Sequence, residues 1–477
     1  MIFKKTVSAI LCLTLVVTLL AGCGSETKAP EEEKTTTPAT EQKSDQNTTQ
    51  NTESAGKGSV RWLNYKPEIA DALQEVAAVY TQETGNEIKI ETAASNQYPA
   101  TLAARMDSSN APTIFIVEGA SMLSVWKDHA RDLSGTKIHS YVTDESYILK
   151  DDEGIARGLS YTLEAWGILV NKKITDAYFA SPNKKTQYTS LDDLYTFKAL
   201  KAVVEDMTAM KEELGIQGVF GSTSLKAGDD WRYQTMLMNQ PLYWEWGGND
   251  KIDLNGLIPE FSFEYNEGYK AILDLYLNNS LIDPKLVGTK TVDDSMAEFA
   301  LGQCAMIQNG DWSWTTVADT EKRVVADEDV CFIPITIGVS GEEKMGLNVG
   351  ASQYMCVNSQ ASEEDQNASL AFLEWLFSSE TGKKLVAQKL QLVTPFSPMA
   401  DAVYTNPLFA SENQIAAAGK TAYCWAVALI PTQTWRDNFG AKLLMYAQGQ
   451  MAWEDVVKQT VEDWVKEREI ANAEMKN

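Results

Sequence analysis

The sequence predicts an α/β protein built from two lobes. Its 477 residues exceed what one hydrophobic core usually serves, and a composition of 44% apolar and 22% charged residues is typical of globular proteins. Short apolar strands alternate with helices of amphipathic spacing, which indicates parallel sheets with right-handed crossovers. Ligands of such sheets bind beyond the carboxyl ends of the strands, so the residues that follow each strand are the candidates for a site.

The first half of the folded part gives clear element signals. An apolar strand at Val60–Leu63 is followed by Pro67, which suits the first turn of a helix, and Gly85 ends that helix. The apolar face of this helix recurs at helical spacing and consists of Ile69, Leu73, Val76, Ala77 and Tyr80. A strand with Ile88 and Ile90, a helix through Leu102 and Met106, and a strand at Thr113–Val117 follow.

The alternation continues to the end of the chain. The expected elements are strand Gly167–Val170, helix Tyr269–Leu277, strands Cys304–Ile307 and Tyr354–Val357, helix Ser369–Phe377 and a last helix. One face of the last helix is expected to carry Val456, Val457, Val461, Trp464 and Val465.

Composition and motifs exclude several function classes. The formal charge of −25 would repel a phosphate backbone, so nucleic acid is not an expected partner. His129 and His139 are the only two histidines, which excludes a His-rich metal site. The chain contains no P-loop, no G-x-S-x-G elbow and no dinucleotide-binding glycine motif after a strand. We therefore expect no catalytic residues, no metal site and no cofactor.

The amino terminus is expected to be an export signal. Lys4 and Lys5 precede an apolar run that is shorter than a membrane-spanning helix, so residues 1–22 are expected to be removed. The sequence Leu20-Ala21-Gly22-Cys23 resembles a bacterial lipobox, which places a lipid on Cys23; a plain signal with an incidental cysteine is the alternative. Residues 24–59 contain no Leu, Ile, Val, Met or aromatic residue, so residues 23–59 are expected to be a disordered tether.

The remaining cysteines show no pairing motif. Cys304, Cys331, Cys356 and Cys424 lack C-x-x-C spacing and lie in apolar runs. Buried free thiols are favoured over a disulfide, which the sequence leaves open.

Two motifs resemble a known family. The run Ala297–Trp314, which contains Asn309-Gly310-Asp311-Trp312, and the run Tyr161–Lys172 resemble the extracellular solute-binding proteins of bacterial ABC importers, typified by the maltose-binding protein. The resemblance covers about residues 60–464. It implies a two-lobed periplasmic-binding-protein fold, type II-like, with a ligand cleft between lobes joined by crossing segments. The implied lobes are 60–163 plus 350–395 and 164–349 plus 396–477.

The resemblance also implies a function. The protein would be a monomeric, lipid-anchored receptor on the outer face of the cytoplasmic membrane of a Gram-positive bacterium. It would capture a carbohydrate by lobe closure and deliver it to the transmembrane subunits of an ABC permease, without being an enzyme.

Candidate binding residues follow from sugar chemistry. Indole rings stack on the C–H faces of a pyranose, and the candidates are Trp312 first, then Trp435, Trp231, Trp166 and Trp246, each of which could instead pack in a core. Planar or charged groups bond hydroxyls, and the polar candidates are Glu164, Glu118, Lys66, Asn64, Arg436, Asp311 and Tyr98. Surface ion pairs or helix caps are their alternative roles. Trp314, two residues after Trp312, is expected in the core.

Other functions stay open. A polyamine, peptide or metal-complex ligand is the first alternative to a sugar, since acidic groups beside aromatic rings also suit a polyamine. A glycoside hydrolase could use two of Glu118, Glu164 and Asp311. A surface adhesin would lack a closing cleft.

Overall fold

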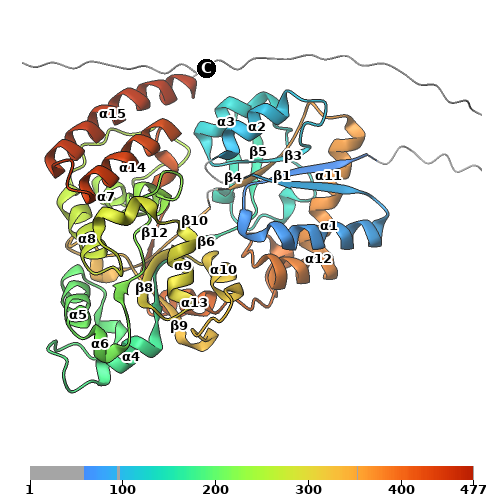
Figure 1. The fold of residues 1–477 in the computed structure, drawn as a ribbon. Helices are drawn as coiled ribbons and strands as arrows, with labels where there is room; N and C mark the ends of the chain where they lie inside the picture. Colours follow the sequence, from blue (N-terminus) through green and yellow to red (C-terminus); the bar gives the residue numbers. More distant parts are fainter. Residues whose placement is uncertain (1–57, 94–96, 352, 476–477) are drawn as a thin grey trace, which may run out of the picture. The chain divides into compact units, whose positions relative to one another are not determined.

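The computed structural model describes residues 58–93, 97–351 and 353–475 (Figure 1). The expected signal peptide, the expected lipidation site Cys23 and residues 24–57 of the expected tether lie outside the described residues. The described chain is a mixed α/β fold that contains two separate six-stranded sheets.

The first sheet has the order β2-β1-β3-β11-β5-β4. Its strands are β1 (Val60–Asn64), β2 (Ile88–Thr92), β3 (Ile114–Val117), β4 (Ile148–Lys150), β5 (Ala156–Ser160) and β11 (Tyr354–Val357). β1 pairs in parallel with β2 and β3, as the strand–helix–strand alternation predicts. β11 is antiparallel to both β3 and β5, so the expectation of an all-parallel sheet is wrong here. The reason is that β11 returns from the second sheet instead of following a crossover helix.

Helices α1 (Ala70–Thr84), α2 (Tyr98–Met106), α3 (Ala120–Trp126), α11 (Glu363–Ser378) and α12 (Glu380–Leu385) flank this sheet (Figure 1). α1 illustrates why they form where they do. Its buried face carries Leu73, Val76 and Tyr80. Gly85 ends the helix at φ 69°, a left-handed conformation that glycine adopts without strain, and its N–H donates to Thr81 O at 2.8 Å.

The second sheet has the order β12-β10-β6-β8-β7, with β9 also paired to β6. Its strands are β6 (Glu164–Asn171), β7 (Gly218–Phe220), β8 (Cys304–Gly310), β9 (Val330–Ile333), β10 (Met345–Gly350) and β12 (Thr421–Tyr423). β6 is antiparallel to β8, β9 and β10, which again differs from the expected parallel order. Every residue of β6 is buried, which explains the apolar run 165–170 between Glu164 and Asn171.

Hydrophobic cores cover both faces of the second sheet. Trp166 and Ile168 face one core, whereas Ala165 and Leu169 face the other, as strand alternation requires. The covering helices are α4 (Lys172–Ala180), α5 (Phe197–Ala209), α6 (Lys211–Leu214), α7 (Asn239–Glu245), α8 (Asn266–Asn278), α9 (Val292–Ala300), α10 (Ser313–Asp319), α13 (Pro407–Ala417), α14 (Gln433–Ala447) and α15 (Trp453–Glu474). On α15, Val456 and Trp464 are buried as expected, but Val465 is 48% exposed because it lies at the edge of that face.

Two chain segments lead directly from a strand of one sheet to a strand of the other. The chain passes from β5 into β6 at residues 161–163 and returns from β10 to β11 after Gly350. The two crossing strands pair where Gly350 lies opposite Glu164, and Leu163 forms a further bridge with Val393. The exact lobe boundaries stay a prediction.

Two further expectations can be compared with the described residues. Cys304, Cys331, Cys356 and Cys424 are all free thiols, and Trp314 is buried at 5% exposure. Within the described part of the chain, no helix has both the length and the apolar character needed to cross a membrane.

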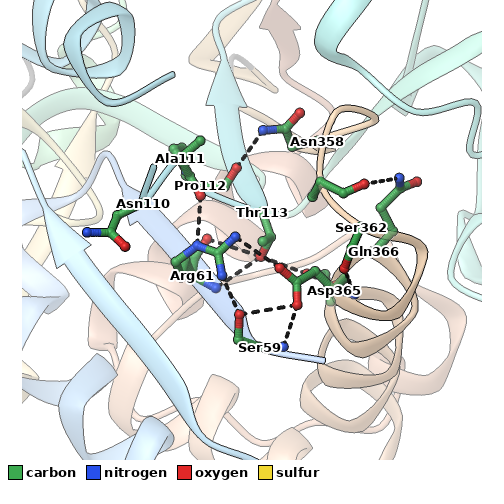
Figure 2. A network of polar contacts seen from close by, with 12 residues as sticks. Ser59, Arg61, Asn110, Ala111, Pro112, Thr113, Asn358, Ser362, Asp365 and Gln366 are labelled. Carbon is green, nitrogen blue, oxygen red and sulfur yellow. Dashed lines mark hydrogen bonds and ion pairs between the residues drawn. The ribbon is translucent and has the colours of Figure 1, made fainter. Parts of the chain in front are cut away.

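A polar clamp ties the start of β1 to the first turn of α11 (Figure 2). Ser59 N donates to Asp365 Oδ1 at 2.7 Å, and Arg61 Nη2 lies 3.1 Å from Asp365 Oδ2. Arg61 Nε also donates to the carbonyl of Ala111 at 2.8 Å, and Ser362 caps α11 by accepting from Asp365 N. The Asp365 carboxylate therefore holds the point at which the chain enters the first sheet.

We expect Asp365→Asn to lower the free energy of unfolding by about 1–3 kcal/mol at pH 7, because it weakens hydrogen bonds to a charged group. Burial raises the pKa of Asp365, but the bonds from Ser59 and the Arg61 charge lower it more, so its net pKa lies below the usual value. The stabilisation is thus present above the unfolded-state pKa and is lost as the pH falls through the folded-state pKa.

Urea unfolding at pH 7 and pH 3 measures the free energy of unfolding of both proteins. Asp365→Asn should lower this free energy less at pH 3 than at pH 7. Asp401→Asn is the control, because Asp401 is 80% exposed in its contact with Lys383. If Asp365→Asn lowered the free energy of unfolding equally at the two pH values, the charge of the Asp365 carboxylate would not be what stabilises the clamp.

Candidate ligand-binding site

The candidate site lies where the carboxyl ends of strands from both sheets meet the crossing strand β6. Lys66 follows β1 and Glu118 follows β3, both in the first sheet. Glu164 begins β6, and Asp311 and Trp312 follow β8 in the second sheet. Chain topology therefore brings together side chains that are far apart in sequence.

Lys66 is the centre of the polar part of the site. Its side chain is 4% exposed, its Nζ pairs with the Glu164 carboxylate, and it lies 2.8 Å from Glu68 Oε1. Burial lowers the pKa of Lys66, but the charges of Glu164 and Glu68 raise it more, so the net pKa lies well above the usual value. The ammonium also lies 5.7 Å from the ring centroid of Trp312, within cation–π range.

Asn64 holds the backbone of Lys66. Its Nδ2 donates to Lys66 O at 2.7 Å, and its Oδ1 accepts from Lys66 N at 3.1 Å. The side chain is fully buried and also bonds Thr92. The amide is thus committed to shaping the turn after β1, and it acts on the site through Lys66.

An aromatic pair borders the polar cluster. The half-buried rings of Trp312 and Trp231 have centroids 6.2 Å apart and planes tilted by 42°. Trp312 folds back over Gly310, where an added Cβ would come within 2.2 Å of the indole. Only glycine lets the ring lie this close to the strand. We refer to Trp231 and Trp312 as the aromatic wall.

Two carboxyl groups, the buried one of Asp311 and the half-buried one of Glu412, lie near each other. Asp311 Oδ2 accepts from Ala165 N at 2.8 Å, and no side chain caps α10, so the helix-cap role is not what the structure shows. Burial, together with the nearby Glu164 charge, raises the pKa of Asp311. Burial and a side-chain contact with Asp311 likewise raise the pKa of Glu412 on α13. Two carboxyl groups in contact share a proton more readily than they both ionise.

A second link between the sheets runs through Glu118. Tyr65 O–H donates to Glu118 Oε1 at 2.8 Å, and Arg436 Nη1 on α14 lies 3.9 Å from Glu118 Oε2. Arg436 Nε is buried without a hydrogen-bond partner among the described residues. The pair joins the loop after β3 to a helix that covers the second sheet.

A small cavity of about 10 Å³ lies beside these groups. Its polar and aromatic lining includes Lys66, Glu68, Glu164, Asp311 and Trp312. In this conformation the cavity admits about one water-sized molecule, which is far less than the volume of a typical small-molecule site. Convergent charged groups, one indole face and contributions from both sheets make this region the candidate binding site.

The structure does not bring four other candidates to this cluster. Trp435 is 0% exposed, stacks on Phe439 at 5.2 Å and donates to Thr460 O, so it packs in a core. Tyr98 is also 0% exposed, and its hydroxyl is used by backbone groups of β1 and β3.

The other two also pack against protein. Trp246 donates to Glu260 O at 2.8 Å and lies against Trp464. Trp166 is 2% exposed and packs on Trp425 at a centroid distance of 4.5 Å. The packing role given as the alternative is the one that the structure shows for these rings.

Three residues of this region were not among the candidate site residues. Tyr65 and Glu68 lie in the segment that follows the first strand, so their position was a usable signal. Glu412 carries no such signal, because helix α13 approaches Asp311 only through long-range folding.

Comparisons with known proteins agree with this geometry. The chain matches the family model of the bacterial extracellular solute-binding proteins over residues 75–417. Its fold is similar to the GacH receptor of Streptomyces glaucescens, solved unliganded and with acarbose, with a TM-score of 0.64, 16% identity and coverage of 87% of this chain and 99% of that chain.

Two more solved structures show the same fold. For a chitin oligosaccharide binding protein the TM-score is 0.64 at 17% identity, with 88% of this chain and 100% of that chain covered. For RafE in complex with raffinose the TM-score is 0.60 at 16% identity, with 86% and 99% covered. No curated protein sequence matches this one significantly.

We expect Glu412→Gln to raise the melting temperature at pH 8 relative to wild type. The pKa of Glu412 is raised in the folded state, so between the two pKa values the folded state binds more protons than the unfolded state. The free energy of unfolding therefore falls as the pH rises from the unfolded-state pKa through the folded-state pKa. Glutamine retains a hydrogen-bonding group but cannot ionise beside Asp311.

Differential scanning calorimetry from pH 4 to pH 9 provides the measurement. The gain should shrink toward pH 4, where wild-type Glu412 is protonated, and Glu469→Gln at an exposed position of α15 is the control. If the increase in melting temperature were the same at every pH, it would not come from the raised pKa of Glu412.

Proposed function

This chain belongs to the family of bacterial extracellular solute-binding proteins, and we propose that it is the receptor of an ABC importer that captures a sugar or oligosaccharide. The observation that carries the carbohydrate assignment is the aromatic wall of Trp231 and Trp312 beside the buried charges of Lys66 and Glu164. A pyranose needs such a combination, because its faces are C–H groups and its edge is hydroxyls.

Lobe closure is the proposed capture mechanism. Lys66 and Glu118 come from the first sheet, while Glu164, Asp311 and Arg436 come from the crossing strand or the second sheet. A ligand that contacts both groups stabilises the state in which they are close, and it does so only by its affinity difference between the open and closed states. The hinge would lie at the segments that cross near Glu164, Gly350 and Val393.

The ligands of proteins with the same fold support a carbohydrate. The solved relatives include complexes with acarbose and raffinose and a chitin oligosaccharide binding protein. Those ligands share the ring faces and hydroxyl edges that the aromatic wall and its charged neighbours suit. We propose binding without hydrolysis, since Glu164 is held in an ion pair with Lys66 and Asp311 is held by Ala165 N.

The cellular setting is also a proposal. Residues 1–22 would be removed, Cys23 would carry the lipid and residues 23–59 would tether a monomeric receptor to the outer face of the cytoplasmic membrane of a Gram-positive bacterium. The partner would be the transmembrane subunits of a permease, and nucleic acid would play no part. The two lobes would comprise residues 60–163 plus 350–395 and 164–349 plus 396–477.

A polyamine is the second candidate ligand, and one observation favours it. Among the described residues, the ion pairs at this site join the carboxyl groups of Glu68, Glu164 and Glu118 to two cations, Lys66 and Arg436, and a fourth carboxyl group, that of Asp311, lies beside them. Acidic groups beside indole rings suit an alkylammonium chain. A thermal-shift panel of sugars, polyamines and peptides separates these ligands, because a ligand at 100 times its Kd stabilises the folded state by about 2.7 kcal/mol.

We expect Trp312→Ala to weaken binding of the sugar identified in that panel by about 2–4 kcal/mol, or about 30- to 1000-fold in Kd. The indole would supply the stacking face, which alanine cannot replace. Isothermal titration calorimetry measures the loss, with Trp375→Ala on α11 as the control because Trp375 bonds Glu83 instead of lining the site. Undiminished affinity in Trp312→Ala would remove this ring from the binding site.

Cys23→Ser tests the anchor. Without the thiol that would carry the lipid, we expect the protein to move from the membrane fraction to the culture medium. Immunoblots of both fractions provide the measurement, and Cys12→Ser in the expected signal is the control that should leave the distribution unchanged. Retention of Cys23→Ser in the membrane fraction would exclude lipid anchoring at this residue.

A further inference from the structure

A second cavity lies inside the cores of the second sheet, away from the candidate site. It is lined by Phe220, Gly221, Ser222, Thr223, Arg232, Tyr233, Tyr276, Ser295, Ile307 and Gln308. Every one of these residues is buried. The space admits about one water-sized molecule.

Four polar atoms of this lining have no hydrogen-bond partner among the described residues. They are Arg232 Nε, Gln308 Oε1 and the hydroxyl oxygens of Tyr276 and Thr223. None of these four residues is more than 3% exposed, so bulk water does not reach them. A buried polar group without a partner destabilises the folded state, and four around one cavity indicate a common bound partner.

The chemistry of the four atoms selects that partner. Arg232 Nε can only donate, Gln308 Oε1 can only accept, and the hydroxyls of Tyr276 and Thr223 can do both. A chloride ion would only accept, so it would leave Gln308 Oε1 unpaired and would also face the negative charge of Glu298 that acts on Arg232. An ammonium ion would lie beside a guanidinium of the same sign. Water fits, because it accepts from Arg232 and donates to Gln308.

We propose that this cavity binds one internal water molecule that joins Arg232, Gln308 and Tyr276. The rest of each side chain is already fixed. Gln308 Nε2 donates to Arg232 O at 2.6 Å, and Arg232 Nη1 donates to Ser295 Oγ at 2.8 Å. The water completes this network because it links side chains from three elements: β8, the π-helical segment Arg232–Leu237 and α8.

The water site also braces the aromatic wall. The Arg232 guanidinium lies 5.9 Å from the ring centroid of Trp231, whose other neighbour in the wall is Trp312. The Arg232 guanidinium donates to Ser295 and Ser224 through its two Nη atoms, and the water would accept from Nε, so all three nitrogens would hold the group beside the ring. The proposed water site does not depend on the proposed function. Only its effect on sugar binding, through the position of Trp231, rests on that function.

Crystals of the protein grown in sodium chloride and in sodium bromide provide the first test. We expect an electron-density peak within hydrogen-bond distance of Arg232 Nε and Gln308 Oε1, with no anomalous signal in bromide. An anomalous peak would assign a halide ion instead, and a cavity without density at high resolution would exclude any bound partner. Either result overturns the proposal.

Variants test the role of the water in solution. Gln308→Leu removes the acceptor, so ¹⁷O magnetic relaxation dispersion should show the loss of one long-lived water, and the near-ultraviolet circular dichroism of the tryptophans should change as Trp231 loosens. Tyr276→Phe removes one partner with little change in shape and should shorten the residence time of the water, which keeps the test available if Gln308→Leu does not fold.

Tyr269→Phe is the matched control. Tyr269 is also buried on α8, but its hydroxyl already donates to Tyr233 O at 2.8 Å and does not line the cavity. Its substitution should leave both the long-lived water and the tryptophan spectrum unchanged. An unchanged residence time in Tyr276→Phe, or the same change in both tyrosine variants, would refute the assignment.

Discussion

The arrangement of the site depends on one buried cation. Lys66 is surrounded by Glu164 and Glu68, and no other ammonium or guanidinium group pairs with these two carboxylates among the described residues. Removal of its charge would leave buried carboxylates unpaired, which is far more costly than an ordinary surface substitution. Because Lys66 follows a strand of the first sheet and Glu164 begins a strand of the second, this ion pair also holds the two sheets together at the site.

The other features of the site support this pair. Asn64 fixes the backbone of Lys66, and the bare backbone of Gly310 lets Trp312 lie within reach of its ammonium. Burial and the nearby carboxyl groups raise the pKa of both Asp311 and Glu412, which disfavours a further negative charge in a region already rich in carboxylates. Water-soluble ligands with apolar faces, such as sugars, suit a site in which one indole wall adjoins a dense set of fixed charges.

Much of the fold could be predicted because its signals are local. Helix α1, with its apolar face and terminal Gly85, and strands β1 to β3 follow from spacing alone. The antiparallel pairing of β11 and of β6 could not be predicted, since it depends on a chain that leaves one sheet and returns to it. The site shows the same division: Lys66, Glu164, Asp311 and Trp312 each follow or begin a strand, whereas Glu412 reaches Asp311 from a distant helix. Trp435 and Tyr98 are both buried in cores, so an aromatic residue near a motif does not by itself indicate a binding site.

The clamp around Asp365 has a mechanical consequence. It grips the chain at Ser59, at the amino end of β1, whereas Lys66 lies past the carboxyl end of the same strand. A force on the residues before Ser59 would therefore load the carboxylate of Asp365 and the helix α11 before it reached the strand. Tension applied at the amino end of the folded part would therefore reach the hydrogen bonds of the clamp before it reached Lys66 and the carboxylates around it.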